Sequence, residues 1–392
     1  MSKTRFLTLA TLALAIQGCG GSTGGGVEPP LSDAATLGEE IFHDQRLSAS
    51  GRMSCASCHD PQLGHASPFP TPVAFGGGAL DAPGLRLPPS IGYLKFNAAF
   101  RIDSDGTPMG GFFWDGRVNT LAEQARKPFL APNEMANADV SAVIARLADA
   151  PYAQRFKAVF GDSILTDPQA AFDRMAYALE RYQIEDKAFA PFSSKFDAVN
   201  AGKASFTAQE LRGLAWFNRA DKGNCAACHP STRPTHAPAA LFTDFTYDSL
   251  GVPRNSAIAA NGNAEFFDMG LCGPVRQDLG ARADLCGKFK VPSLRNVALR
   301  KRFFHNGSFG DPGKTAAENL MEVVRFYVTR DTQPALWYPA EPYDDLPAAL
   351  RGNVNVSEAP YNRKSGQSAA LSDDEITDLV VFLQTLTDGY KP

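Results

Sequence analysis

The pentapeptide Cys-x-x-Cys-His occurs twice in this chain, and it restricts the chemistry of the folded protein more than any other feature. Two cysteines at this spacing form thioethers to the vinyl groups of c-type haem, and the histidine that follows directly becomes an axial ligand of the iron. The predicted attachment residues are Cys55, Cys58 and His59 in the first motif and Cys225, Cys228 and His229 in the second. We therefore predict two covalently bound haem c groups, one in each of two domains.

Two other kinds of site use the same residue types. Zinc binds thiolates and imidazoles, and a redox dithiol uses the Cys-x-x-Cys spacing alone. A reactive dithiol does not require a histidine after both copies. The export signal at the start of the chain also favours haem attachment over both alternatives.

The N-terminus has the features of a bacterial export signal. Lys3 and Arg5 precede an apolar run at residues 6–16, which is too short to span a bilayer as a mature helix. The tetrapeptide that ends at Cys19 resembles a lipobox, so we expect residues 1–18 to be removed and Cys19 to be lipidated. An ordinary cleaved signal is the alternative. Residues 19–31 are rich in Gly, Ser and Pro and are expected to form a flexible tether, which predicts a periplasmic protein anchored only by lipid.

The remaining cysteines can be assigned by subtraction. Of the 7 cysteines, four belong to the haem motifs and one is Cys19, which leaves Cys272 and Cys286. In an oxidising periplasm these two are expected to form a disulfide, with two free buried thiols as the alternative. The formal net charge of −4 does not suggest a nucleic-acid partner.

Hydrophobic periodicity predicts a mainly α-helical chain with long loops. Apolar residues recur at helical spacing in 139–200 and in 320–327, and capping boxes open the segments that begin at Thr207 and Ser372. Residues 66–92 and 231–285 lack such periodicity. We interpret residues 195–203 as a link between an N-terminal domain, 32–200, and a C-terminal domain, 201–392.

Several residues outside the motifs are candidates for chemistry. Glu134 follows two closely spaced prolines that fix a loop, and Trp114 lies in an aromatic, glycine-rich stretch. Taken alone, a solvated carboxylate and a core tryptophan are the simpler interpretations. His43 and His65 flank the first motif, where either can be an iron ligand, although a surface or core histidine is the more common case.

Taken together, these motifs resemble the bacterial di-haem cytochrome c peroxidase superfamily, and in particular its MauG-like branch with the methanobactin-associated enzymes. The resemblance extends from residue 32 to the end of the chain. It rests on both haem motifs and on four further stretches, at residues 113–117, 134–135, 292–296 and 304–307. It implies two cytochrome-c-like helical domains whose haems face a shared interface.

The resemblance also implies roles for single residues. Trp114 matches the aromatic between the two haems, and Glu134 matches the distal acid of the peroxide-binding haem. Gln124 and Pro128 match residues that line that distal pocket. The second haem's far ligand is a methionine in the peroxidases, and that position is Tyr327 here, as in the MauG-like branch. Met321 lies nearer the edge of the helical face.

The chain departs from the family pattern at three places. Leu87 stands where the family has a calcium-binding asparagine, and Arg300 and Arg302 fall near the carbonyl donors, so calcium is not expected. Gly223 stands where the MauG-like enzymes have a tryptophan two residues before the second motif.

The sequence therefore predicts a periplasmic di-haem peroxidase-like oxidoreductase. It would use hydrogen peroxide to reach a high-valent di-haem state and oxidise an aromatic side chain, expected to be tryptophan, on a partner protein. The first alternative is a cytochrome c peroxidase that takes electrons from a small cytochrome or cupredoxin. The second is a di-haem cytochrome that carries electrons without catalysis.

Overall fold

The structure, a computed structural model, describes residues 30–391. The signal segment, Cys19 and most of the tether lie outside the described residues. The rest of the chain, Leu31–Pro392, forms one compact unit by its internal contacts. Within residues 30–391, no helix has both the length and the apolar character needed to cross a membrane.

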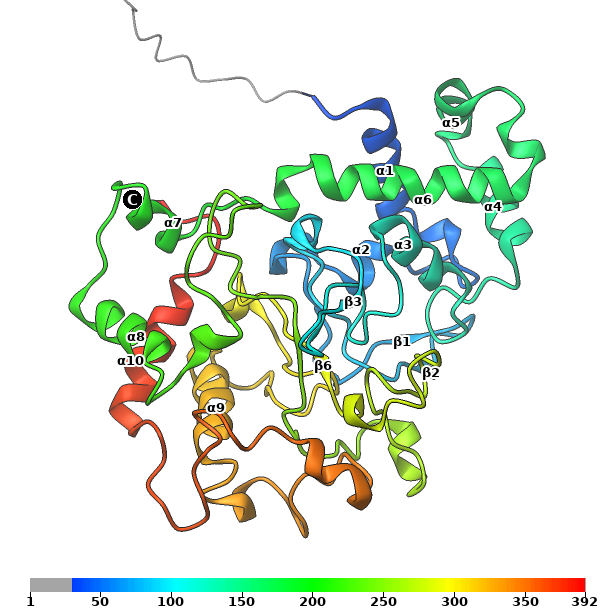
Figure 1. Ribbon diagram of the computed structural model, residues 1–392. Coiled ribbons are helices and arrows are strands. Elements are labelled where there is room, and N and C mark those ends of the chain that lie inside the picture. Colours follow the sequence, from blue (N-terminus) through cyan, green and yellow to red (C-terminus); the bar gives the residue numbers. More distant parts are fainter. Residues whose placement is uncertain (1–29, 392) are drawn as a thin grey trace, which may run out of the picture. The chain divides into compact units, whose positions relative to one another are not determined.

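Helices dominate the described chain, which confirms the predicted fold class (Figure 1). The first half holds α1 (Asp33–His43), α2 (Cys55–Cys58), α3 (Leu121–Leu130), α4 (Val140–Ala148), α5 (Ala153–Phe160), α6 (Pro168–Glu185) and α7 (Lys195–Asn200). The second half holds α8 (Ala208–Asn218), α9 (Ala316–Thr329) and α10 (Asp373–Gln384). Three two-residue antiparallel ladders pair β1 (Phe75–Gly76) with β2 (Ala82–Pro83), β3 (Arg101–Ile102) with β4 (Pro108–Met109), and β5 (Tyr247–Asp248) with β6 (Phe289–Lys290).

Two large hydrophobic clusters make up most of the core. The first contains buried residues between positions 37 and 189, and the second contains buried residues between 196 and 386. Each cluster therefore draws on one of the two halves of the sequence. The division into domains at residue 200 stays a prediction.

The same close helix crossing occurs in both halves. In α1 and α8, a glycine is followed four residues later by a fully buried phenylalanine, Gly38 with Phe42 and Gly213 with Phe217. A Cβ on Gly38 would lie 2.0 Å from the Ala178 carbonyl oxygen of α6, and one on Gly213 would lie 2.1 Å from the Asp378 carbonyl oxygen of α10. Only glycine allows the paired backbones to approach this closely.

Capping boxes begin α8, α9 and α10, and those predicted at Thr207 and Ser372 are confirmed. Residues 195–203, which the sequence predicts to link the two domains, begin with a short helix. Residues Lys195–Asn200 form α7, which Ser194 caps, and Phe196 is buried in the second cluster. The physical reason is that Phe196 packs against Phe242, with ring centroids 4.9 Å apart, so the segment contributes to the core.

Buried polar contacts join the two halves. Arg86 binds Asp115 from its own half at 2.7 Å and Asp268 from the second half at 2.6 Å. The Lys290 amide donates to the Trp114 carbonyl oxygen at 2.9 Å, and the Tyr247 hydroxyl donates to the Gly110 carbonyl oxygen at 2.6 Å.

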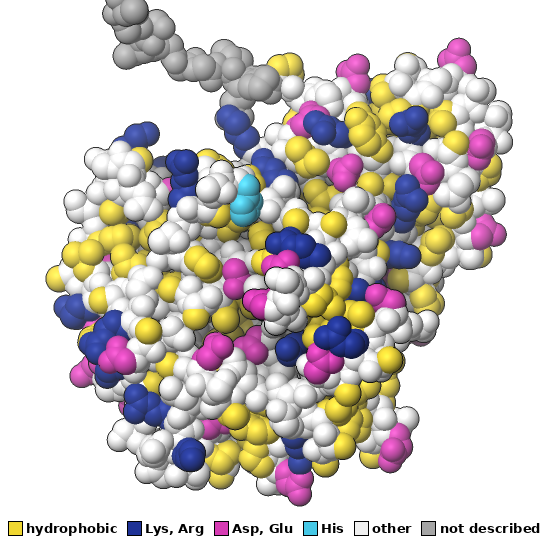
Figure 2. All heavy atoms as spheres, in the orientation of Figure 1, with side chains coloured by type: hydrophobic (Ala, Val, Ile, Leu, Met, Phe, Trp, Pro, Cys, Tyr) yellow, Lys and Arg dark blue, Asp and Glu magenta, His cyan; other side chains and the backbone are white. Residues whose placement is uncertain are grey.

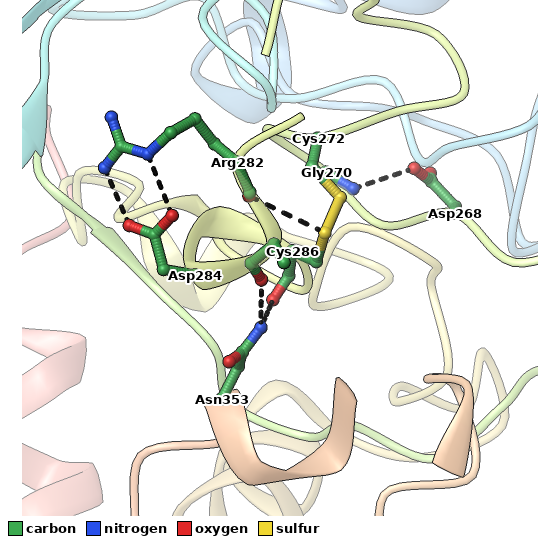
Figure 3. Close-up of a disulfide and its surroundings, with 8 residues drawn as sticks. Asp268, Gly270, Cys272, Arg282, Asp284, Cys286 and Asn353 are labelled. Atoms are coloured by element: carbon green, nitrogen blue, oxygen red, sulfur yellow. Dashed lines mark hydrogen bonds and ion pairs between the residues drawn. A yellow bond between two sulfur atoms is a disulfide. The ribbon is translucent and has the colours of Figure 1, made fainter. Parts of the chain in front are cut away.

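Cys272 and Cys286 form the predicted disulfide, with an S–S distance of 2.05 Å (Figure 3). Between the two cysteines the one regular element is the short 3₁₀ helix Ala283–Leu285. Asn353 donates to the Cys286 carbonyl oxygen at 3.0 Å and also to that of Ala283. The disulfide and Asn353 together fix this loop near β6.

The face of the molecule in Figure 2 carries Lys and Arg side chains interspersed with Asp and Glu. Hydrophobic side chains lie between them in several small groups. No single sign of charge dominates this face, which agrees with the nearly balanced charge of the whole chain.

Candidate functional site

The second Cys-x-x-Cys-His motif borders a pocket that both halves of the chain line. Cys225, Cys228 and His229 contribute from the motif, and Tyr327 contributes from α9. Most of the exposed lining is apolar, with side chains from α9 and α10, Leu320, Val324, Leu379 and Leu383. The first half contributes a stretch around Leu87 together with Trp114.

His229 is oriented for metal ligation by the hydrogen bond it makes. Its Nδ1 lies 2.9 Å from the Phe242 carbonyl oxygen, so Nδ1 carries the proton and donates it. The Nε2 lone pair is then available to a metal. Burial lowers the pKa of His229 to about 4, which keeps the imidazole neutral, as a metal ligand must be.

The cysteines of both motifs are half-buried, and their thiols stay protonated at neutral pH. Burial raises the pKa of Cys55, Cys58, Cys225 and Cys228 to about 12 in each case, and none of the four forms a disulfide. A redox dithiol needs a thiol pKa below the usual value. Within residues 30–391, no group of three or more His, Cys, Asp and Glu side chains could hold a metal ion. The raised pKa of the thiols therefore fits thioether attachment of haem better than redox exchange.

The first motif places His59 in a comparable environment. The four residues of α2 carry both cysteines, and His59 follows as the residue that ends the helix. Burial lowers the pKa of His59 to about 4, while the carbonyl groups of His65 and Pro89 favour the protonated ring. The buried Nδ1 has no hydrogen-bond partner of good geometry among the described residues.

Glu134 lies beside the thiols of the first motif. Its negative charge contributes to the raised pKa of both Cys55 and Cys58, after burial. Burial raises the pKa of Glu134 itself, and Arg117 only partly opposes this. The Gly77 amide donates to the Glu134 carbonyl oxygen at 2.8 Å, and a Cβ on Gly76 would lie 2.7 Å from the Glu134 Cα. The loop that carries Glu134 is thus held directly against β1.

Gln124 and Pro128 lie one turn apart on α3, so they share one face of that helix. The Met135 amide donates to the Pro128 carbonyl oxygen at 3.1 Å, which ties the residue after Glu134 to α3. Pro128 is therefore close to the Glu134 loop. For Gln124 the structure shows a half-buried position on the same helix face.

Trp114 lies where the two halves meet. Its indole Nε1 donates to the Leu87 carbonyl oxygen at 2.7 Å, and its side chain lines the pocket of the second motif. The next residue, Asp115, is fully buried between Arg86 and Arg117. Trp114 is therefore held by a hydrogen bond on its ring and by ion pairs on its neighbour.

Tyr327 lines the same pocket as His229. Burial raises the pKa of Tyr327, and the Cys228 and Cys225 thiols raise it further. Phe304 and Tyr361 flank the phenol ring, with centroids 5.7 and 5.9 Å away. Met321 is half-buried on the same helix but is not part of the pocket lining.

The two other histidines differ in position. His43 is exposed at the end of α1. His65 is buried and stacks on Phe189 at 3.9 Å, and neither of its ring nitrogens has a hydrogen-bond partner among the described residues. Sequence patterns gave no signal for Asp268 and Asp345, two buried carboxylates that also line the second pocket.

Residues 32–205 match the family described as di-haem cytochrome c peroxidase. The chain is 36% identical over 395 residues to methylamine utilization protein MauG of Paracoccus denitrificans (strain Pd 1222), with 99% of this chain and 97% of that protein covered. It is 31% identical over 305 residues to cytochrome c551 peroxidase of Nitrosomonas europaea, with 76% and 74% covered. The crystal structure of the dihaem peroxidase BthA from Burkholderia thailandensis E264 matches with a TM-score of 0.84 and 38% identity, over 93% of this chain and 88% of that one.

Proposed function

The chain belongs to the di-haem cytochrome c peroxidase family that includes MauG, with two covalently bound c-type haems, and from this premise we propose a specific oxidative role. The protein is a periplasmic oxidoreductase that reduces hydrogen peroxide and oxidises an aromatic side chain, a tryptophan, on a partner protein. Residues 32–200 carry the peroxide-reacting haem and residues 201–392 carry the second haem. Lipid on Cys19 anchors the enzyme to a membrane.

When bound, the haems supply the redox chemistry that no side chain can provide. Glu134 supplies the proton transfers. Reduction of one peroxide to two waters consumes two protons and two electrons, and a protonated carboxyl beside the first motif can deliver protons as the O–O bond breaks. Burial of Glu134 supports this role because its raised pKa keeps more of the acid form at a given pH.

The single observation that carries the proposal is Tyr327 on the lining of the second pocket. A tyrosine oxygen is a hard donor and stabilises oxidised iron, whereas a methionine thioether raises the reduction potential. His229 and Tyr327 would hold the second haem, and an oxygen donor from Tyr327 would favour oxidised over reduced iron there. Trp114, which contacts Leu87 and lines the same pocket, provides the path between the two halves.

Relatives that are named cytochrome c peroxidases favour one alternative, in which a small cytochrome or cupredoxin gives the two electrons. A non-catalytic electron carrier is the second alternative. It requires a six-coordinate first haem, so peroxide would leave its spectrum unchanged.

The test is co-expression of the enzyme with the protein encoded by the neighbouring gene, followed by peroxide and mass spectrometry of that protein. Oxidation of an aromatic residue in the neighbour, dependent on both the enzyme and peroxide, is the expected result. Fast peroxide-driven oxidation of a reduced small cytochrome, with an unmodified neighbour, would instead establish the peroxidase alternative.

A further inference from the structure

Arg300 is half-buried, and no protein carboxylate neutralises its charge. It follows the 3₁₀ turn Val297–Leu299, and its Nη2 donates to the carbonyl oxygens of Ser293 and Arg295. Its Nε is buried and has no hydrogen-bond partner among the described residues. Burial is the one influence on its pKa, which falls to about 10. A charged group in such a place is costly unless an anion is supplied.

Three arginines with deeply buried side chains show how this chain normally treats such a charge. Each is paired with a carboxylate, with Asp115 and Asp268 serving Arg86, Asp197 serving Arg295, and Asp331 serving Arg330. Within residues 30–391, no Asp or Glu oxygen lies within 4.0 Å of the Arg300 guanidinium. Its anion must therefore come from outside the polypeptide.

The pocket that Arg300 lines identifies the chemical class of that anion. The same pocket is lined by Cys225, Cys228 and His229, so the haem attached there shares it with the guanidinium. Haem brings two propionate carboxylates, and a guanidinium binds a carboxylate through two parallel hydrogen bonds. We infer that Arg300 is the counter-ion of a propionate of the haem attached to Cys225 and Cys228.

Two neighbouring cations are poorer candidates for this role. Lys301 is exposed, and the Arg302 Nε donates to the Pro70 carbonyl oxygen at 2.7 Å from a more open position. Arg302 also lines the pocket, which makes it the matched control.

The counter-ion role has a redox consequence. Removal of a positive charge beside the propionate stabilises oxidised, more positive iron relative to reduced iron.

The experiment is spectroelectrochemical titration of both haems in the full-length holoprotein, with haem content checked first. Arg300→Gln is expected to lower the equilibrium constant for reduction of the haem on His229 by about tenfold or more. A tenfold decrease corresponds to a reduction potential that is lower by about 59 mV for one electron. Arg302→Gln is expected to shift it much less. Arg300→Lys, which keeps a charge, should shift it less than Arg300→Gln.

Three results would overturn the inference. One is an unchanged potential in Arg300→Gln with both haems retained. Another is an equal shift in Arg302→Gln, and the third is a shift confined to the haem on His59. If Arg300→Gln loses haem, Arg300→Lys decides the matter. A potential close to wild type supports the counter-ion, and a tenfold shift despite the retained charge rejects it.

Discussion

Burial controls the protonation state of the ionisable groups beside the two haem motifs. It raises the pKa of the Cys55 thiol to about 12 and lowers that of His59 to about 4, so both are neutral near pH 7. A neutral imidazole is the form that iron ligation uses. The same desolvation raises the pKa of Glu134, and it therefore favours the protonated carboxyl that can act as an acid in catalysis.

We predict that Glu134→Gln slows the reaction with peroxide by about 10²–10⁴-fold, because general acid–base catalysis contributes that much. The variant should retain both haems, since Gln has nearly the same size. Stopped-flow mixing with peroxide provides the measurement. Because burial raises the pKa of Glu134, the wild-type rate should change with pH through a group whose pKa lies above 4.5, and the variant should lose that dependence. A wild-type rate in the variant would remove Glu134 from the mechanism.

Tyr327→His is predicted to keep the second haem six-coordinate but to abolish the long-lived spectral state that follows peroxide addition, because imidazole replaces an oxygen donor. Tyr361→Phe is the matched control, since its ring lies 5.9 Å from Tyr327 in the same pocket. Absorption spectra before and after peroxide decide the outcome. A methionine–iron charge-transfer band in the wild-type protein would show that Tyr327 is not the ligand.

The sequence predicted the attachment residues because their chemistry depends on local spacing. It could not predict the unpaired charge of Arg300, because a missing partner is visible only when all the surrounding elements are placed. The ion pair between Asp268 and Arg86 was also not predictable, because it joins residues far apart in the chain. Family resemblance placed Tyr327 and Glu134, and the structure adds their surroundings.

At the scale of elements, helices with strong capping signals were predictable and the short ladders were not. The capping boxes at Thr207 and Ser372 mark α8 and α10 in the sequence. Two-residue strands such as β5 are too short to show any alternation. The repeated Gly-x-x-x-Phe spacing in α1 and α8 is visible in the sequence, but its meaning depends on the helices α6 and α10 that cross there.

Gly213→Ala is predicted to destabilise the protein although alanine favours helices. The propensity gain is about 1 kcal/mol, whereas overpacking a tight contact costs about 1–3 kcal/mol and sometimes more. The contact here is tight, since the new Cβ would lie 2.1 Å from a backbone oxygen of α10, which cannot rotate away. Denaturant unfolding should show the loss. Gly352→Ala is the control, because a Cβ there meets nothing within 4 Å. Equal stability of the two variants would contradict the close crossing.

At the scale of the whole molecule, the two large cores are joined by buried polar contacts and by smaller apolar clusters, one of which packs Tyr93 with Leu241 and Phe245. The first cluster ends at Phe189 and the second begins at Phe196, so the chain passes from one core to the other within a short segment. Trp114 and the second pocket lie where the two halves meet. Electron transfer through Trp114, which the proposed function requires, therefore depends on the relative position of the two halves.

Replacement of Arg86 should weaken the contact between the two halves. Its guanidinium binds Asp115 and Asp268 in a buried site, so Arg86→Met leaves Asp268 without its cation and Asp115 with Arg117 alone. Breaking a buried ion pair from one side costs about 3–5 kcal/mol. Calorimetry at pH 7 should show that loss, and Arg101→Met should show almost none, because the Arg101–Asp103 pair is exposed.

The same ion pair predicts a dependence on pH. Burial alone would raise the pKa of Asp268, but the charge of Arg86 outweighs it and lowers that pKa below 3.8 in the folded protein. A carboxyl with a lowered folded pKa stabilises the fold above its unfolded pKa, and this contribution disappears as the pH falls through the folded value. Wild-type stability should therefore decline below about pH 4. Asp268→Asn should be less stable at pH 7 and show a shallower acid decline. Parallel acid-unfolding curves for the two proteins would show that the stability of the contact between the two halves does not depend on the Asp268 charge.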